Sequence, residues 1–124
     1  MDQITQQSVR QPINAAHLRN TIGDDPEFIV ELYGIYVDDA RNRLANLDSA
    51  LVAANPERIQ DAAHALKGSS GNVGAARMSE LAAQLEKVEY AADSELARDL
   101  AIQLHVEFAD VETFVERFVR NSQQ

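Results

Sequence analysis

The sequence predicts an all-α fold: an antiparallel up-and-down four-helix bundle with a short additional N-terminal helix. Apolar residues recur at steps of three and four along four long segments, which is the spacing of one face of an α-helix. These segments are separated by a glycine, or by an asparagine or aspartate that can begin the next helix. No strand-like alternation or hairpin signal competes with the helical pattern. Short connections between long amphipathic helices favour an antiparallel bundle.

The chain has 124 residues, which is the length of one ordinary domain with a real core. Residues 1–12 are polar, rich in glutamine and without periodicity, so we expect a flexible N-terminal tail there. A single bundle domain is expected over 13–120, followed by a C-terminal tail over 121–124. The short first helix is expected to begin after Asn14 as its N-cap and to stop at Gly23.

Each of the four long helices has a recognisable beginning. Residues 25–27 read Asp-Pro-Glu and residues 55–57 read Asn-Pro-Glu, which place an N-cap, a proline at the first helical position and an acid in the first turn. Gly74 predicts the stop before the third long helix, and a turn near 93–94 predicts the cap of the fourth. The predicted core-facing positions are Ile29, Leu32, Tyr33, Tyr36, Ala40, Leu44, Leu47 and Leu51; Ile59, Ala62, Ala63, Leu66, Ser70 and Val73; Met78, Leu81, Ala82, Leu85 and Val88; and Ala97, Leu100, Leu104, Phe108, Val111, Val115 and Phe118.

Composition excludes several classes of partner. The chain has 20 acidic and 11 basic residues, a formal net charge of -9, which repels nucleic acid and anionic lipid. No segment approaches the roughly 20 apolar residues of a membrane-spanning helix, and the N-terminus lacks the apolar run of a secretory signal. Without cysteine there is no disulfide framework and no thiolate metal site. We expect a soluble, cytoplasmic monomer that binds neither nucleic acid nor a membrane.

The stretch HALKGSSGN, residues 64–72, is unusual inside a helix because it holds two glycines and two serines. On a helical wheel that turns about 100° per residue, with Ile59 at zero, the apolar residues of this segment lie within about 60° of it. His64 then falls at about 140° and Gly68 at about 180°, so both face water. Each glycine costs roughly 1 kcal/mol relative to alanine. A helix that accepts this cost beside an exposed imidazole indicates a surface built for close approach.

Simpler interpretations of the same residues stay open. His64 could be an ordinary surface histidine, like His17 and His105, whose surroundings are unremarkable. Gly68 and Gly71 could mark fraying before the end of the helix, and the two serines that follow Gly68 could be polar filler. The coincidence of several unusual residues on one helix face favours a site over these readings.

Other chemistries fit the sequence less well. The glycines of 68–74 do not follow a strand and lack the Gly-Lys-Ser/Thr ending of a phosphate-binding loop. The three histidines are scattered without a Glu-x-x-His pair, which argues against a metal site in the bundle. The serines lack the context of a hydrolase nucleophile. An exposed neutral imidazole, in contrast, is a good covalent carrier near physiological pH, and a lysine one turn away supplies positive charge.

The segment AHALKGSSGNVGA, residues 63–75, resembles the signature of histidine-containing phosphotransfer (HPt) domains, the four-helix-bundle carriers of two-component phosphorelays. The pattern His-x-Leu-Lys-Gly-Ser followed by Gly-Ala carries the resemblance, and Leu-Glu at 85–86 in the next helix is also similar to the family. The resemblance extends over nearly the whole chain, from the short first helix to Phe118, although only 64–86 is diagnostic.

The resemblance implies a role for several residues. It places the phosphoryl acceptor on His64, the charge-stabilising lysine on Lys67 and the small residue that permits partner access on Gly68. The family often holds the imidazole with a glutamine or another polar residue of the neighbouring helix, and Glu86 occupies that place here. Glu86 either orients the ring or is an ordinary surface acid. Arg77 either flanks the site or is simply a solvated arginine.

The function implied by the resemblance is that of a histidine phosphotransfer protein without autonomous catalytic activity. It would accept a phosphoryl group on His64 from a receiver-domain aspartate and pass it to another receiver. Its partners would be the receiver domains of response regulators and hybrid sensor histidine kinases. The receiver would supply the acidic pocket and the Mg²⁺, so no cofactor and no metal of this chain's own is expected. The alternative is a helical adaptor that binds receivers without phosphoryl transfer, but the presence of His64, Lys67 and Gly68 argues against it. A dimerising kinase bundle would need a nucleotide-binding domain, for which 124 residues leave no room.

Overall fold

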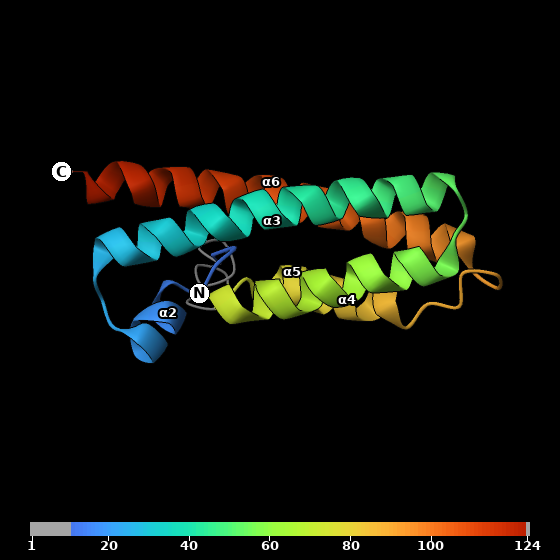
Figure 1. Ribbon diagram of the computed structural model, residues 1–124, viewed down its shortest axis with the longest axis horizontal. Coiled ribbons are helices and arrows are strands. Elements are labelled where there is room, and N and C mark those ends of the chain that lie inside the picture. Colours follow the sequence, from blue (N-terminus) through green and yellow to red (C-terminus); the bar gives the residue numbers. More distant parts are fainter. Residues whose placement is uncertain (1–10, 124) are drawn as a thin grey trace, which may run out of the picture.

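The computed structural model describes residues 11–123, and every regular element in that range is a helix. A short helix precedes four longer ones (Figure 1). Their bounds are α2 Ala15–Ile22, α3 Pro26–Val52, α4 Pro56–Val73, α5 Ala76–Glu86 and α6 Ser94–Ser122. The prediction of an all-α bundle with a short additional N-terminal helix is therefore confirmed.

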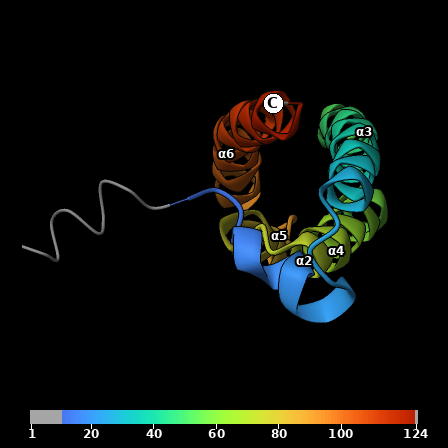
Figure 2. The same ribbon diagram turned by 90° about the vertical axis from the view of Figure 1, so that its left-hand side faces the viewer.

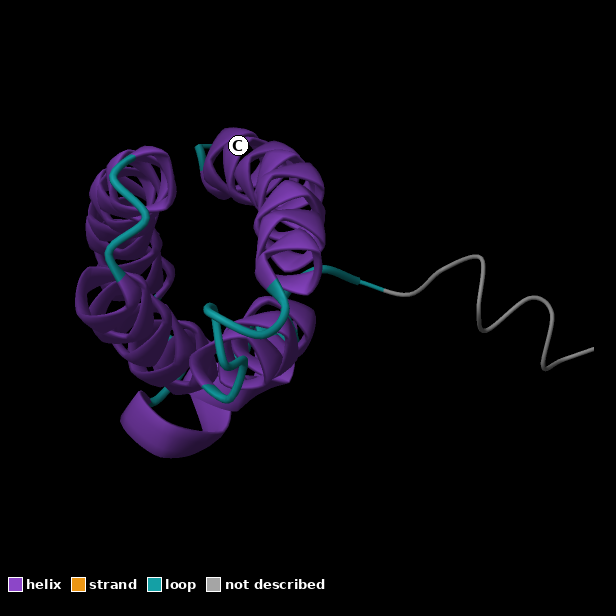
Figure 3. Cartoon of the chain, turned by 90° about the vertical axis from the view of Figure 1, so that its right-hand side faces the viewer, coloured by secondary structure: helices purple, strands orange, loops and turns teal. Residues whose placement is uncertain are grey.

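The four longer helices form a closed ring of neighbours. Helix α3 packs against α4 and α6, and α5 packs against the same two helices from the other side. The view along the bundle shows this arrangement and places α2 across one end, beside α4 and α5 (Figure 2). The turns that join α3 to α4 and α5 to α6 lie at the opposite end (Figure 3). Successive helices run in opposite directions because each connection is short.

Side-chain caps fix where four of the helices begin. The side chains of Asn14, Asp25, Asn55 and Asp93 each accept a hydrogen bond from a backbone N–H in the first turn of the helix that follows. These bonds satisfy donors that have no partner within the helix. The predicted beginnings of α2, α3, α4 and α6 are thus confirmed. Helix α5 lacks such a bond, because Ala75 occupies its N-cap position.

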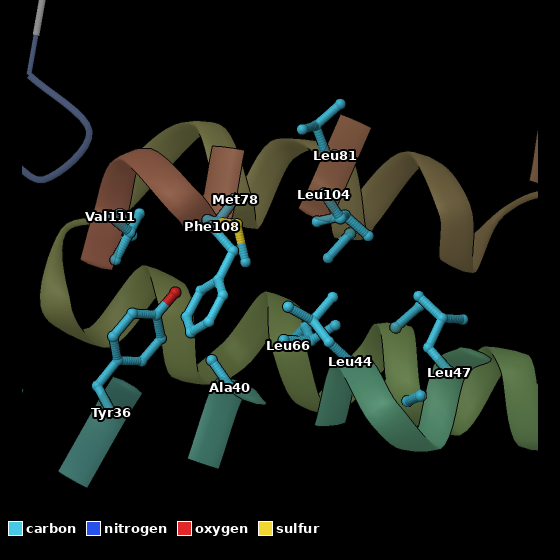
Figure 4. Packing of buried hydrophobic residues seen from close by; sticks show 14 of the residues in the cluster. Tyr36, Ala40, Leu44, Leu47, Leu66, Met78, Leu81, Leu104, Phe108 and Val111 are labelled. Atoms are coloured by element: carbon cyan, nitrogen blue, oxygen red, sulfur yellow. The ribbon is translucent and has the colours of Figure 1, made fainter. Parts of the chain in front are cut away.

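The core is built from the predicted apolar stripes. Side chains of α3, α4, α5 and α6 interdigitate along the bundle axis (Figure 4). The single buried polar residue of the core in the described chain is Ser70, whose Oγ lies 2.7 Å from the Tyr36 hydroxyl. Burial raises the pKa of Tyr36 to about 12. This bond between neutral groups ties α3 to α4 and satisfies both hydroxyls.

Two helix ends differ from the sequence prediction. Helix α5 has 11 residues and ends at Glu86, so Val88 lies beyond it, although Val88 still packs against the core. Helix α6 continues to Ser122, into the segment predicted as the tail 121–124, where the Ser122 hydroxyl donates to the Phe118 carbonyl. Residues 1–10 and 124 lie outside the described residues, so most of the predicted tail 1–12 lies there too.

Gly74 ends α4 and positions α2. Its φ of +83° is left-handed, which glycine adopts at little cost. Its carbonyl accepts the Asn14 N–H at 2.9 Å, and a Cβ at this position would lie only 2.8 Å from His17 Cβ. The short helix therefore packs closely on the C-terminal end of α4 because Gly74 has no side chain.

Among the described helices, none combines the length and the apolar composition that a bilayer-spanning segment requires.

Candidate functional site

Helix α4 presents the histidine that the sequence singled out. The side chain of His64 is 70% exposed, while Ala63 and Leu66 beside it are fully buried. The predicted orientation of the histidine toward solvent is therefore confirmed. Lys67, one turn further along α4, is 40% exposed and leans toward α5.

Helix α5 brings a carboxylate to both of these residues. Glu86 Oε2 lies 2.7 Å from His64 Nδ1, and Glu86 Oε1 lies 2.8 Å from Lys67 Nζ. One carboxylate therefore bridges His64 and Lys67, two residues of α4. Of the two readings of Glu86 left open by the sequence, the geometry supports the one in which it contacts the imidazole.

The environment of Glu86 keeps it ionised. The contact with Lys67, followed by that with His64, lowers the pKa of Glu86 below its usual range. Glu86 is also the last residue of α5, where the negative end of the helix dipole disfavours a carboxylate. The two α4 side chains offset this disadvantage.

An ionised carboxylate can only accept a hydrogen bond, so it determines the form of the ring. When His64 is neutral and bonded to Glu86, its Nδ1 must carry the proton. The lone pair then resides on Nε2, the ring nitrogen that does not take part in the hydrogen bond to Glu86. The arrangement leaves a nucleophilic nitrogen at the surface of the bundle.

Gly68 lies one turn beyond His64 and is exposed. A Cβ built on Gly68 would meet no atom within 4 Å, so the backbone of α4 is bare there. The helix continues through Gly71 to Val73, so these glycines lie within regular helix and do not mark a frayed end. A partner can approach the α4 backbone closely beside the imidazole.

Several other residues considered at the sequence level lie elsewhere. The Arg77 guanidinium donates to Glu80 and Gln103, each at 3.5 Å, and neither bond involves His64, Lys67 or Glu86. Ser70 is fully buried against α3, whereas Ser69 is half-buried. The Arg77 geometry fits the interpretation of an ordinary surface arginine.

The two remaining histidines differ from His64. His17 lies on α2. His105 is on α6, and its Nε2 lies 2.9 and 3.0 Å from the two carboxylate oxygens of Asp48. Nε2 of His105 is therefore hydrogen-bonded to Asp48, whereas within residues 11–123 the hydrogen bond of the His64 ring is made through Nδ1 and not through Nε2. In residues 11–123, no group of three or more His, Cys, Asp or Glu residues is arranged to hold a metal ion.

One residue beside the site was missed at the sequence level. Ser79 Oγ, on α5, donates to the Lys67 carbonyl at 2.9 Å. A sequence signal was available, because Ser79 and Glu86 are seven residues apart and so share one face of a helix.

The fold and the site together define a helical bundle with a surface histidine, His64, that is held through Nδ1 and has its Nε2 directed away from that bond. The Hpt domain family model matches residues 31–116, more than half of the chain, and the chain belongs to the Hpt domain family. Members of this family are histidine phosphotransfer proteins that carry a phosphoryl group, generally are not enzymes, and interact with receiver domains of two-component systems.

The chain is also similar to a solved structure, that of histidine-containing phosphotransfer protein B from Pseudomonas aeruginosa PAO1. The two sequences are 29% identical, and the match covers 85% of this chain and 91% of that one with a TM-score of 0.74. No curated protein sequence matches the chain significantly.

The pKa of Glu86 provides a test of the bridge. Because Lys67 makes the largest contribution, Lys67→Met should raise the Glu86 pKa more than His64→Gln does. The folded-state pKa lies below that of the unfolded chain, so the carboxylate's contribution to folding is present at neutral pH and is lost as the pH falls through the folded-state pKa. NMR titration of the Glu86 carboxyl carbon measures both shifts.

Arg77→Gln is the control for this titration, because Arg77 does not contact Glu86. The bridge is contradicted if Glu86 in the unaltered protein titrates in the usual range of a glutamate, or if Arg77→Gln shifts its pKa as far as Lys67→Met does.

Proposed function

We propose that this chain accepts a phosphoryl group on His64 Nε2 from the phosphorylated aspartate of one receiver domain and passes it to the aspartate of another. The observation that carries the proposal is an exposed imidazole whose Nδ1 lies 2.7 Å from the Glu86 carboxylate. That contact leaves Nε2 as the nucleophile, at a surface that Gly68 keeps open. Family membership supports the same chemistry.

The transfer needs no proton to enter or leave the ring. The Nε2 lone pair attacks phosphorus, an N–P bond forms, and the bond from phosphorus to the aspartate oxygen breaks with its electron pair on that oxygen. The ring becomes a phosphoimidazolium that keeps its Nδ1 proton, and the Glu86 carboxylate stabilises the new positive charge. Transfer to the second receiver reverses these steps, because its aspartate oxygen attacks phosphorus and the lone pair returns to Nε2.

Lys67 and Gly68 assist the reaction in different ways. The Lys67 ammonium provides positive charge one helical turn from the ring, which favours the charged phosphoryl group in the transition state. Gly68 lets the receiver bring its aspartate to the nitrogen. Alignment and charge neutralisation are the main demands of phosphoryl transfer. The receiver contributes the Mg²⁺, so this chain acts as a carrier without a cofactor of its own.

His64→Gln should abolish phosphoryl acceptance from a phosphorylated receiver. The exposed side chain contributes little to packing, so helical circular dichroism and the melting temperature should remain close to those of the unaltered protein. His105→Gln is the matched control, because the outer nitrogen of that ring already contacts Asp48, and it should accept label normally. Radiolabelled phosphate transferred from the receiver measures both variants.

The same assay distinguishes a carrier from an enzyme and from an adaptor. With ATP and Mg²⁺ alone the protein should stay unlabelled. With the phosphorylated receiver, label should survive alkali and be lost in acid, as a phosphoramidate is. Labelling by ATP alone, acid-stable label, or label retained in His64→Gln would each contradict the proposal, and receiver binding without transfer would indicate the adaptor.

Gly68→Gln should block transfer while leaving the fold intact, because the new side chain would fill the space that the receiver needs. Glutamine is a better helix former than glycine, so the helix should become as stable or more stable, by up to about 1 kcal/mol. Gly34→Gln is the matched control, since Gly34 is also a helical glycine with open space around its Cβ position but lies on α3. Single-turnover transfer kinetics and thermal unfolding measure the pair; normal transfer by Gly68→Gln would remove the proposed role of the glycine.

A further inference from the structure

Ser79 uses its hydroxyl differently from three other hydroxyls in the helices. Thr21, Thr113 and Ser122 each donate to a carbonyl four residues earlier in their own helix, which is the usual local bond of a helical hydroxyl. Ser79 Oγ instead donates to the carbonyl of Lys67 on α4, at 2.9 Å. The hydroxyl therefore joins two helices.

The two helices approach closely where this bond forms. A Cβ built on Gly71 of α4 would lie 3.5 Å from Ser79 Oγ, so no side chain of α4 separates the hydroxyl from the backbone. A helix carbonyl oxygen has two lone pairs, and it can accept this second bond beside the bond of its own helix. The serine thus fixes a point on α5 against a point on the α4 backbone.

The point fixed by Ser79 belongs to the same lysine that contacts Glu86. The Lys67 carbonyl accepts from Ser79, and its ammonium lies 2.8 Å from Glu86 Oε1. Ser79 and Glu86 are seven residues apart on one face of α5. Lys67 is therefore held by α5 at two points, its carbonyl by Ser79 and its ammonium by Glu86. His64 contacts the same carboxylate of Glu86.

We propose that Ser79 is a positioning residue for the phosphoryl acceptor: its bond to the Lys67 carbonyl sets how far α5 lies along α4, and so keeps the Glu86 carboxylate on His64 Nδ1. This inference rests on the proposed function for its significance, although the positions themselves can be measured without any receiver. The core side chains of α5 hold it against the bundle, and the Ser79 bond adds a fixed point along the axis next to the site.

Glu86 needs such a fixed point because of where it lies. It is the last residue of α5, and helix ends fray. Its hydrogen bond to the ring depends on tenths of an ångström, and a misplacement of about 1 Å reduces catalysis strongly in positioned sites. A slide of α5 along α4 would lengthen the contact to His64 Nδ1 and leave the ring free to exchange its proton between the two nitrogens.

The test compares Ser79→Ala with the unaltered, unphosphorylated protein. The NMR chemical shifts of the two His64 ring nitrogens report the fraction of the ring that carries its proton on Nδ1. In Ser79→Ala the ratio of this form to the other should fall roughly 2- to 10-fold, the equivalent of one net hydrogen bond. Ser79→Thr keeps the hydroxyl and should restore most of the ratio.

Ser70→Ala is the matched control. It also removes one hydrogen bond between helices, but that bond joins α4 to Tyr36 of α3, so it should lower the melting temperature without changing the His64 ratio. An unchanged ratio in Ser79→Ala, or an equal change in Ser70→Ala, would overturn the inference.

Transfer kinetics complete the test. With a phosphorylated receiver, Ser79→Ala should slow single-turnover transfer by about the factor by which the ratio of the two ring forms falls. The receiver concentration that gives half the maximal rate should stay unchanged, because Ser79 acts on the ring and not on receiver docking. A change confined to docking would contradict positioning. If the unaltered protein receives no phosphate, the proposed function fails, while the nitrogen shifts still decide whether Ser79 positions the ring.

Discussion

The carboxylate of Glu86, shared between His64 Nδ1 and Lys67 Nζ, is the interaction on which the site depends. It makes Nδ1 the protonated nitrogen of the neutral ring and leaves the outer nitrogen with its lone pair. It also lies where a positive charge would develop during phosphoryl transfer. A single carboxylate thus connects α4 to α5, places the proton of the neutral ring on Nδ1, and contacts the ammonium of Lys67 on the same side.

The bundle makes this interaction possible because the core and the site use different faces of the same helices. The buried faces of α4 and α5 hold the helices together, while His64, Gly68 and Glu86 lie on or near the outer surface. Two hydrogen bonds of serine hydroxyls also join these helices: that of Ser70 joins α4 to α3, and that of Ser79 joins α5 to α4. The two glycines within α4 weaken the helix slightly, but Gly68 leaves its backbone open to solvent and Gly71 leaves room for the Ser79 hydroxyl.

Periodicity and capping residues predicted the helices and the exposure of His64, because burial repeats with the helical turn and a cap satisfies the first turn of its own helix. They could not predict the bonds of Ser79 and Ser70, since contacts between helices depend on axial register and separation. The end of α5 at Glu86 was equally hidden, because no glycine or proline marks it. The placement of Glu86 beside the ring came from family resemblance, and its contact with Lys67 required the structure.

We propose that Glu86 directs phosphoryl transfer to Nε2, the outer nitrogen of His64. The most direct measurement is NMR of the phosphorylated protein, in which coupling between phosphorus and a labelled ring nitrogen identifies the atom that carries the phosphoryl group. We expect coupling to Nε2 of His64, with the Nδ1 proton still present. Phosphorus coupled to Nδ1, or to a nitrogen of another histidine, would contradict it.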